Sequence, residues 1–396
     1  MKEDKTVPQL RFPEFTDAWK QRKLGDIATF LNGRAYSQDE LQSSGKYKIL
    51  RVGNFYTNDS WYYSDMELGE KFYANKGDLL YTWSATFGPH IWEGDKVIYH
   101  YHIWKIALTE FLDKMFALQL LEQDKSNLLN NLNGSTMVHM TKLGMESKQV
   151  IIPNSLEEQA KIGSFFTQLD NTITLQQRKL NSLQKLKKGL LQKMFPKKGE
   201  NIPEIRFPKF SDAWKQRELG EIAERVTRRN SSLESQTPLT ISAEYGLIDQ
   251  NKFFGKRIAA KDLSNYYLIQ KGEFAYNKST SNDAPWGAIK RLDCYNNGAL
   301  STLYIVFKIK DNKSCYSDFL VTYYGTSLWH KGVKEIATEG ARNHGLLNVS
   351  PSDFFRTKLV IPQDFEEQRK IGAFFTQLDN TITLQQRWLF YTHKQS

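Results

Sequence analysis

Side chains able to hydrogen-bond to base edges gather in the polar loops of this 396-residue chain, and they predict nucleic-acid recognition. Arginine and lysine suit guanine, asparagine and glutamine suit adenine, and cations also contact phosphates. The candidates in the first half of the chain are Arg34, Tyr36, Lys46, Lys48, Arg51, Asn54, Ser84, Thr86, His90, Ser135, Thr136 and His139. Those in the second half are Arg228, Arg229, Asn230, Lys278, Ser279, Thr280, Ser281, Asn282, Trp286, Lys290, Arg291, Arg342, Asn343 and His344. Each competes with a plainer interpretation as a solvated surface group.

Motifs that would indicate catalysis are missing from the sequence. It contains no G-x-G-x-x-G, no G-K-[ST] phosphate loop and no [DN]-P-P-[FYW] tetrapeptide, which amino-methyltransferases use to hold a flipped base. The acidic pairs Glu157-Glu158 and Glu366-Glu367 could belong to a nuclease metal site, but their place at predicted helix starts favours a structural role. His100 and His102 would share one face of a strand and could ligate zinc. No third ligand follows at a recognisable spacing, so we predict no metal site.

The elements that must position these loops are repeated. Residues 11–28 return as residues 206–223 with fourteen identities in eighteen positions. A second block, residues 152–178, returns as residues 361–387 and includes an unbroken twelve-residue match, TQLDNTITLQQR. The material between the blocks does not match in this way, and its second copy is 14 residues longer. A repeated frame with two unlike inserts predicts one architecture that presents two different recognition surfaces.

Each second block of the frame has the pattern of a long helix. Ser155 with Glu158, and Asp364 with Glu367, have the spacing of a capping box at a helix start. Apolar residues then recur at alternating three- and four-residue steps, which is the pattern of a coiled-coil seam. We assign to this seam Ile162, Phe166, Leu169, Ile173, Leu180, Leu183, Leu190, Ile371, Phe375, Leu378, Ile382 and Leu389.

The first helix, predicted from Glu157 to Phe195, would span roughly 55 Å. Neither helix is apolar on all sides, so each needs a partner, and the other copy in the same chain is the nearest one. An antiparallel pair would relate the two inserts by a pseudo-twofold axis. The second helix departs from the first after Arg387, where WLFYTHKQS replaces KLNSLQKLKKGLLQKMF. The effect of this abbreviated helix on pairing, on docking of partners or on spacing stays open.

The inserts read as mixed α/β (α+β) domains with the same element order. Equivalent glycines, Gly77 and Gly272, start a strand in each. A later apolar strand is predicted over residues 97–108 and 303–309, and a helix over residues 112–132 and 318–336. Thr141 and Ser350 are predicted N-caps just before a closing strand that ends in Ile-Pro.

Composition limits the class of protein. The length suits two domains, and two cysteines are too few for a disulfide framework, as expected in a reducing cytoplasm. The sequence shows neither a signal-peptide pattern nor a long apolar run, so we expect no membrane association. The net charge is +10, and the acid-free stretch between Asp170 and Glu200 supplies +8 of it. That stretch is either a solvated helix face or a phosphate contact.

This order of motifs resembles the specificity subunit of type I restriction-modification systems over essentially the whole chain. The residues that carry the likeness are the R-F-P-x-F-x-D-A-W-K-Q-R segments, the I-P-x-x-x-E-E-Q helix starts, and the Phe-Phe pairs leading into LDNTI. The resemblance implies two target-recognition domains that each read one half of a bipartite sequence in double-stranded DNA, with the helices fixing the gap. It divides the chain into a first recognition domain with its leading segment, a central helix, a second recognition domain with its leading segment, and a distal helix, at residues 1–155, 156–198, 199–364 and 365–396.

The same resemblance implies a subunit without catalysis or a cofactor of its own. Two modification (methyltransferase) subunits and the restriction subunits would dock on it, and S-adenosylmethionine, ATP and Mg would act in those partners. Two other classes stay open from the residues alone: a coiled-coil scaffold that binds other proteins, and a nuclease with an unrecognised site. The sequence leaves the target bases and the spacer length undetermined, because neither loop geometry nor helix crossing can be read from it.

Overall fold

The computed structural model describes residues 7–56, 58–84, 86–131, 140–242, 245–282, 284–311, 313–337 and 345–395. Its contacts divide the chain into a first unit, Met1–Thr174, and a second unit, Leu175–Ser396. The boundary falls inside the long helix α4, Leu156–Lys193. No helix in the described ranges combines the length and apolar character that crossing a bilayer needs.

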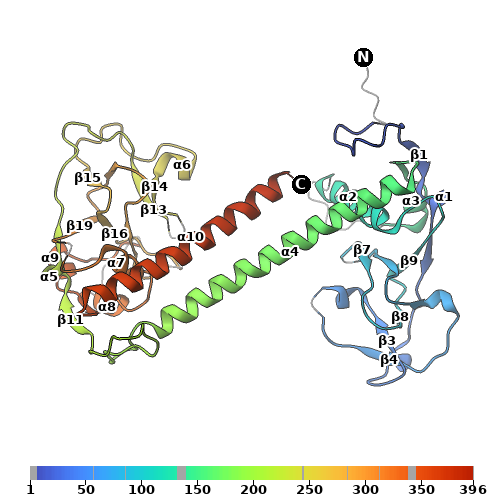
Figure 1. Cartoon of the computed structure of the whole chain (residues 1–396), viewed down its shortest axis with the longest axis horizontal. Helices are drawn as coiled ribbons and strands as arrows, with labels where there is room; N and C mark the ends of the chain where they lie inside the picture. Colours follow the sequence, from blue (N-terminus) through green and yellow to red (C-terminus); the bar gives the residue numbers. More distant parts are fainter. Residues whose placement is uncertain are drawn as a thin grey trace, which may run out of the picture. The chain divides into compact units, whose positions relative to one another are not determined.

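The first unit contains two four-stranded sheets (Figure 1). One has the antiparallel order β2-β9-β6-β7, with β2 at Ala28–Asn32, β9 at Ile103–Leu108, β6 at Leu79–Thr82 and β7 at Gly88–Ile91. The other has the order β4-β3-β8-β5, with β4 at Tyr62–Ser64, β3 at Tyr47–Leu50, β8 at Val97–Tyr99 and β5 at Tyr73–Ala74. The remaining elements are β1 (Lys20–Lys23), β10 (Gln149–Ile152), α1 (Leu24–Ile27), α2 (Lys114–Asn131), α3 (Lys142–Glu146), and the 3-10 turns η1 (Gln38–Glu40), η2 (Val52–Phe55) and η3 (Glu70–Phe72).

The second unit repeats this topology with different residues. Its main sheet has the order β12-β19-β16-β17, with β12 at Ala223–Arg225, β19 at Ile305–Ile309, β16 at Phe274–Asn277 and β17 at Ala288–Arg291. Two antiparallel pairs stand for the other sheet: β13 (Leu239–Ser242) with β14 (Gly246–Asp249), and β15 (Tyr267–Gln270) with β18 (Asn297–Leu300). A parallel bridge from Pro238 to Ala299 joins them, as β3 joins β8 in the first unit. The remaining elements are β11 (Lys215–Glu218), β20 (Lys358–Ile361), α5 (Leu219–Ile222), α6 (Gln250–Phe254), α7 (Ser317–Tyr324), α8 (His330–Ile336), α9 (Pro351–Phe355) and α10 (Phe365–Gln395).

The shared topology confirms the prediction of one mixed α/β fold built twice. Gly77 and Gly272 both have a φ of +88°, a left-handed conformation that glycine adopts without strain, and each precedes the strand predicted from it. Thr141 and Ser350 accept hydrogen bonds as the predicted N-caps. Two predicted elements were wrong in extent. The strand over residues 97–108 is interrupted by a turn between β8 and β9, and the helix over residues 318–336 is broken into α7 and α8.

An ion pair buried in the frame fastens the leading segment of each unit to its long helix. In the second unit Arg206 donates from Nε and Nη2 to the two carboxylate oxygens of Glu367, at 2.5 and 2.7 Å, and Glu367 is 0% exposed. In the first unit Arg11 does the same with Glu158, at 2.6 and 2.8 Å. The indole of Trp19 also donates to Glu158 at 3.1 Å. The two acidic pairs are therefore structural, as predicted.

The capping boxes predicted from these residues are only half formed. Ser155 Oγ accepts from the backbone N–H of Glu158 at 3.3 Å, but the Glu158 carboxylate is held by the Arg11 guanidinium instead of returning to the cap. Asp364 caps its helix through the N–H of Glu366 at 2.7 Å, which is one residue earlier than the spacing predicted. The Glu158 carboxylate is stabilised more by Arg11 than by the backbone N–H of the cap, because a charged donor strengthens the hydrogen bond.

Within the second unit α10 packs antiparallel to the second half of α4 (Figure 1). Gln385 Nε2 donates to Gln176 Oε1 at 2.6 Å, and Lys187 forms an ion pair with Asp379. Phe195, just after α4, lies 6.4 Å from the ring of Phe375. This order of contacts runs in opposite directions along the two helices and confirms the predicted antiparallel pair.

The predicted seam is buried where these helices meet. Leu180, Ile371, Phe375, Ile382 and Leu389 are buried. Leu183, Leu190 and Leu378 are partly buried, as are Ile162, Leu169 and Ile173 in the first unit. Phe166 departs from the prediction because it is 43% exposed and its ring contact is with the neighbouring Phe165, at 5.4 Å. Its equivalent Phe375 is covered by Phe195, whereas the ring of Phe166 meets no such cover.

Candidate nucleic-acid interface

In the first unit several chain segments meet at the end of the main sheet where β6 turns into β7. The backbone N–H of Tyr101 donates to Arg34 O at 3.0 Å, and that of Trp83 donates to His102 O at 3.1 Å. Tyr56, from the loop after β3, places its hydroxyl 3.2 Å from His90 Nε2. The structure therefore brings together loops that lie far apart in the sequence. We call this end of the sheet, with Arg34, Tyr56, Trp83, His90 and Tyr101, the first loop surface.

Most of the cations predicted in this unit are already engaged by the protein. Arg34 pairs with Glu40 at 2.5 Å, and its guanidinium lies over the ring of Tyr36. The hydrogen bond from Arg34 keeps the pKa of the Glu40 carboxyl below its ordinary value. Arg51 lies 4.3 Å from the centroid of the Tyr62 ring and donates to Ser60 O. These arginines stabilise their own loops. To contact a base directly, each would have to give up its present ion pair, hydrogen bond or ring contact within the protein.

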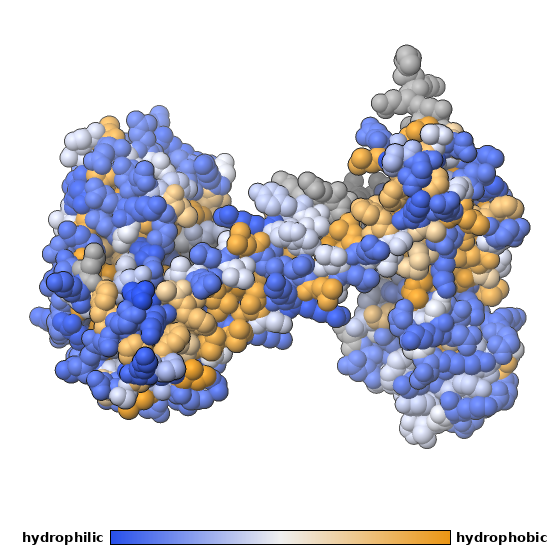
Figure 2. All heavy atoms as spheres, viewed as in Figure 1, coloured by the Kyte–Doolittle hydropathy of each residue, from blue (hydrophilic) through white to orange (hydrophobic). Residues whose placement is uncertain are grey.

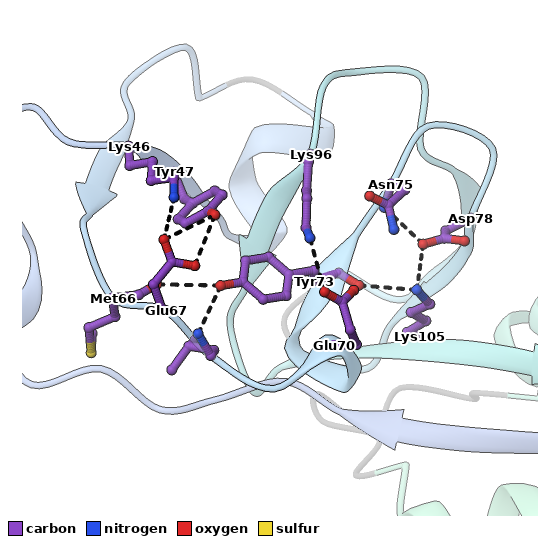
Figure 3. A network of polar contacts seen from close by, with 11 residues as sticks. Lys46, Tyr47, Met66, Glu67, Glu70, Tyr73, Asn75, Asp78, Lys96 and Lys105 are labelled. Atoms are coloured by element: carbon purple, nitrogen blue, oxygen red, sulfur yellow. Dashed lines mark hydrogen bonds and ion pairs between the residues drawn. The ribbon is translucent and has the colours of Figure 1, made fainter.

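Lys46 belongs to a polar network on the second sheet of the unit (Figure 3). It forms an ion pair with Glu67, and the Tyr47 hydroxyl donates to the same carboxylate at 3.2 Å. The hydrogen bond to Glu67 raises the pKa of Lys46. Lys48 differs, because it is exposed and its ammonium lies 5.2 Å from the Trp61 ring without an acidic partner among the described residues. Lys48 is therefore the freer of the two for a phosphate.

The other polar candidates of this unit divide between support and exposure. Asn54 is a loop-forming residue, since its amide donates to Asn58 O and Ser60 O and its oxygen accepts from the Arg51 N–H. The Tyr36 ring is largely buried and lies 6.4 Å from the His100 ring. Ser84 and Thr86 lie at the hairpin tip, joined by a 2.8 Å backbone hydrogen bond. Of these, Thr86 is fully exposed and best placed for contact.

His90 is held among aromatic and hydroxyl groups at this surface. Its ring stacks on Phe55 with centroids 4.1 Å apart and planes at 16°, and Thr82 Oγ1 lies 3.4 Å from Nε2. Burial, together with the positive charge of Lys125, lowers its pKa to about 4. The imidazole is therefore neutral at physiological pH.

This lowered pKa predicts an acid-sensitive first unit. The ordinary histidine pKa is 6.5, so as the pH falls the unfolded chain takes up a proton before the folded one does. The free energy of unfolding of the first unit should therefore decrease between pH 6.5 and about pH 4. Hydrogen exchange of first-unit peptides at pH 7 and pH 5 measures this, and His90→Gln should weaken the pH dependence. An equal dependence in the variant would contradict the assignment to His90; His100, whose pKa burial also lowers to about 4, should leave a residual effect.

In the second unit the corresponding hairpin tip lies beside the strand-like segment after residue 344. Thr280 donates from its N–H and hydroxyl to Gly345 O, at 2.7 and 3.1 Å, and the N–H of Leu347 donates to Lys278 O. Lys278 Nζ also reaches Val349 O at 3.4 Å, and burial lowers its pKa. Ser279, Ser281 and Asn282 are exposed on the same tip. We call the tip, residues 278–282, with Gly345 and Leu346 the second loop surface.

Several second-unit candidates bond within their own domain, and their contact with DNA stays a prediction. Asn230 is 1% exposed, and its amide group bonds three backbone groups, the N–H and O of Ser235 and the O of Leu263. Arg228 donates to both oxygens of the buried Glu273, at 3.0 and 2.8 Å. Arg291 is held by Asp293 and Asp318, each at 2.7 Å. Each of these side chains is therefore engaged within its own domain.

Three further candidates lie in different surroundings. Arg229 is exposed, lies 4.8 Å from the Tyr267 ring and donates to Asn265 O. Trp286 packs against the core beneath the hairpin. Burial lowers the pKa of Lys290, and the charge of Lys187 on α4 lowers it as well, whereas the charge of Asp379 on α10 raises it. The charged neighbours of Lys290 therefore belong to the helical frame. Lys290 is therefore placed toward the helices and not toward the second loop surface.

Some predicted residues lie outside the described residues: Ser135, Thr136, His139, Arg342, Asn343 and His344. Sequence reasoning also missed the aromatic groups of the first loop surface. Tyr56 and Tyr101 are large exposed side chains, at 44% and 39%. Their signal in the sequence is an aromatic residue beside each predicted polar cluster.

The described residues hold no group of three or more His, Cys, Asp and Glu side chains that could bind a metal ion. The rings of His100 and His102 lie 4.8 Å apart, and burial lowers the pKa of both. On the face shown in Figure 2 hydrophilic residues cover most of each unit. The geometry is that of two unlike loop surfaces on equivalent scaffolds, one polar and aromatic in the first unit and one polar in the second.

Comparison with known proteins supports this architecture with a match to a defined domain. Residues 16–185 match the type I restriction modification DNA specificity domain. This part of the chain therefore resembles type I restriction-modification specificity subunits. The match covers the first unit and most of α4.

Two similar proteins extend the comparison. The type I restriction enzyme MjaVIII specificity subunit of Methanocaldococcus jannaschii is 26% identical over 224 residues, which are 56% of this chain and 49% of that protein. The chain thus spans about half the length of this curated relative. The crystal structure of a type I restriction-modification system S subunit from M. genitalium aligns over 98% of this chain and 96% of its own, with a TM-score of 0.60 and 14% identity. That likeness extends the specificity-subunit fold to both units.

Proposed function

We propose that this chain is the DNA sequence-recognition subunit of a type I restriction-modification complex, with one recognition domain for each half of a bipartite target. The observation that carries the proposal is one strand topology built twice, with unlike loop surfaces at the equivalent end of its main sheet. A shared scaffold keeps the geometry of presentation, while different side chains change what is read.

The proposal assigns no catalysis to this chain. Two modification subunits and the restriction subunits would dock on it and carry out methylation and cleavage in the cytoplasm. S-adenosylmethionine, ATP and Mg would act in those partners. The family supports this division of labour, and the purified chain should therefore neither methylate nor cleave DNA.

Adding the modification subunits should yield adenine methylation at one bipartite sequence, which methylome sequencing reads directly. Methylation or cleavage by the isolated chain would overturn the proposal. A scaffold that binds only proteins would show weak DNA association with little response to salt. About six phosphate contacts should instead give a slope of log K against log salt near −5 or steeper.

Exchange of the first recognition domain tests its independence. The segment from Leu24 to Val150 is closed by the antiparallel ladder of β1 and β10, in which Arg22 pairs with Val150. Replacing this segment with that of a relative leaves the Arg11–Glu158 ion pair in place. We expect methylome sequencing to show a change in one half of the target and no change in the other. A change in both halves would contradict independent reading.

A further inference from the structure

The connection between β14 and β15 in the second unit carries two exposed aromatic rings on a defined turn. The short helix α6 begins at Asp249, whose carboxylate accepts from the N–H of Asn251 at 2.9 Å. It ends at Gly255, which has a φ of +65° in the left-handed region. Phe253 and Phe254 are 48% and 45% exposed, and their rings meet edge to face at 4.9 Å. Among the described residues neither ring joins a hydrophobic core cluster.

Both ends of this connection are fastened to the sheet. The N–H of Gln250 donates to Pro238 O at 2.8 Å, and Leu263 is buried. The N–H of Ala260 reaches the Tyr266 hydroxyl at 3.4 Å. Because the connection is anchored at both ends, it presents the two rings at a defined position on the domain.

Cations flank the two rings along the chain and outnumber the acids of the same segment. Lys252, Lys256 and Lys261 are exposed and form no ion pair within the described part of the chain. Arg257 donates to the carbonyls of Ala260 and Lys261, both at 2.9 Å. Asp249 caps α6, and Asp262 accepts from the N–H and hydroxyl of Ser264. Residues 249–262 therefore carry four cations against two carboxylates, a net charge of +2.

The first unit has no counterpart of this segment. Its corresponding connection, from β4 to β5, covers only residues 65–72, whereas the second unit uses residues 250–266. The first unit instead has a long connection from β3 to β4, residues 51–61, where the second unit has residues 243–245. The two recognition domains thus carry their long loops on opposite ends of the same outer strand.

We infer that residues 250–261, the α6 arm, contact double-stranded DNA, with Phe253 and Phe254 against the bases or sugars and the flanking lysines on phosphates. This inference rests on the proposed function and adds the residues that contact DNA in the second unit. Proteins that bind in the minor groove insert apolar side chains beside Lys and Arg in this way. A protein partner fits less well, because lysine is depleted at protein interfaces.

The experiment uses the full chain and duplexes that it enriches from a random-sequence pool. Phe253→Ala/Phe254→Ala should reduce affinity for these duplexes by about tenfold, as expected for lost stacking or wedge contacts. Lys252→Gln/Lys256→Gln should reduce the steepness of the salt slope by about two. Lys331→Gln/Lys334→Gln, which removes the same two charges at exposed lysines of α8, is the control and should leave the affinity unchanged.

Each outcome separates this inference from the proposed function. Failure of the unmodified chain to enrich any bipartite sequence would sink both. Enrichment by the unmodified chain, with the alanine variant binding equally well, would overturn only the α6 arm. Unchanged DNA affinity together with lost assembly on modification subunits would make the arm a protein contact and also overturn the inference. Thermal unfolding of each variant checks that the exposed substitutions leave the fold intact. Phe253→Leu/Phe254→Leu keeps apolar bulk, so its affinity for DNA should lie between that of the unmodified chain and that of the alanine variant.

Discussion

Replacing Glu367 with glutamine is expected to lower the free energy of unfolding of the second unit by about 3–5 kcal/mol, the range for breaking a buried ion pair from one side. Glu367 is 0% exposed and accepts two hydrogen bonds from Arg206, which itself is nearly buried. The hydrogen bond to Glu367 raises the pKa of Arg206. An arginine side chain keeps its charge in proteins, so the substitution leaves a nearly buried guanidinium without its anionic partner. The indole of Trp214, 3.4 Å from the same carboxylate, also loses its charged acceptor.

The neighbouring residue supplies a matched control. Glu366 pairs with Arg369 on the surface of the same helix turn, where both side chains are about half exposed. Glu366→Gln should leave the stability nearly unchanged, because water screens a surface pair. Urea unfolding with hydrogen exchange resolved by peptide distinguishes the two units. Equal effects of the two substitutions would show that the buried pair does not hold the leading segment. Glu158→Gln against Glu157→Gln repeats the comparison in the first unit.

Replacing Gly372 with alanine is expected to destabilise the second unit by about 1–3 kcal/mol, the usual cost of overpacking a close contact. A Cβ atom at Gly372 would lie 2.6 Å from the backbone N of Phe319 and 2.8 Å from the carbonyl carbon of Asp318. Both atoms belong to the backbone at the start of α7, so no side-chain rotation relieves the clash. Alanine would have to push α7 away from α10, and this outweighs its better helix propensity.

The opposite sign is expected at Gly189 in α4. A Cβ there meets nothing within 4 Å, so Gly189→Ala gains helix propensity without a clash and should stabilise by about 0.5–1 kcal/mol. Thermal unfolding of the two single variants gives the comparison directly. A stabilised Gly372→Ala protein would mean that α7 yields easily, and that the tight contact is not needed to seat the recognition domain on its helix. Gly163→Ala, 2.5 Å from Phe116 N, should follow Gly372→Ala in the first unit.

The sequence predicts the frame well because local signals determine it. The helix predicted over residues 157–195 is α4 at residues 156–193, since a cap, a regular seam and a following proline all act on neighbouring residues. The break between α7 and α8 was missed for the opposite reason. Trp329 turns its indole back to donate to Tyr324 O at 3.1 Å and is buried in the core. The break at Trp329 depends on packing in the whole domain. It leaves no mark on the helical periodicity of the sequence.

The candidate interface was harder to predict because ion pairs join residues distant in sequence. Arg228 meets Glu273 across 45 positions, and Arg291 meets Asp318 across 27. No local sequence pattern distinguishes an arginine that forms an internal ion pair from one that is available to bind a phosphate. The exposed phenylalanines of α6 escaped notice for a related reason, since an aromatic pair in a mixed domain is usually part of the core.

Gln176 and Gln385 occupy the same position in the two copies of the repeat, and they bond to each other at 2.6 Å. A residue that meets its own duplicate marks the point about which the antiparallel pair is locally symmetric. The contact between the helices is therefore one that two separate, identical chains would also make. A protein of half this length, with a single head and a single helix, would contain the residue that pairs with its own copy, and it would dimerise through this helix. The present chain has the local symmetry of such a homodimer, and its two copies differ in their heads and in the end of the second helix.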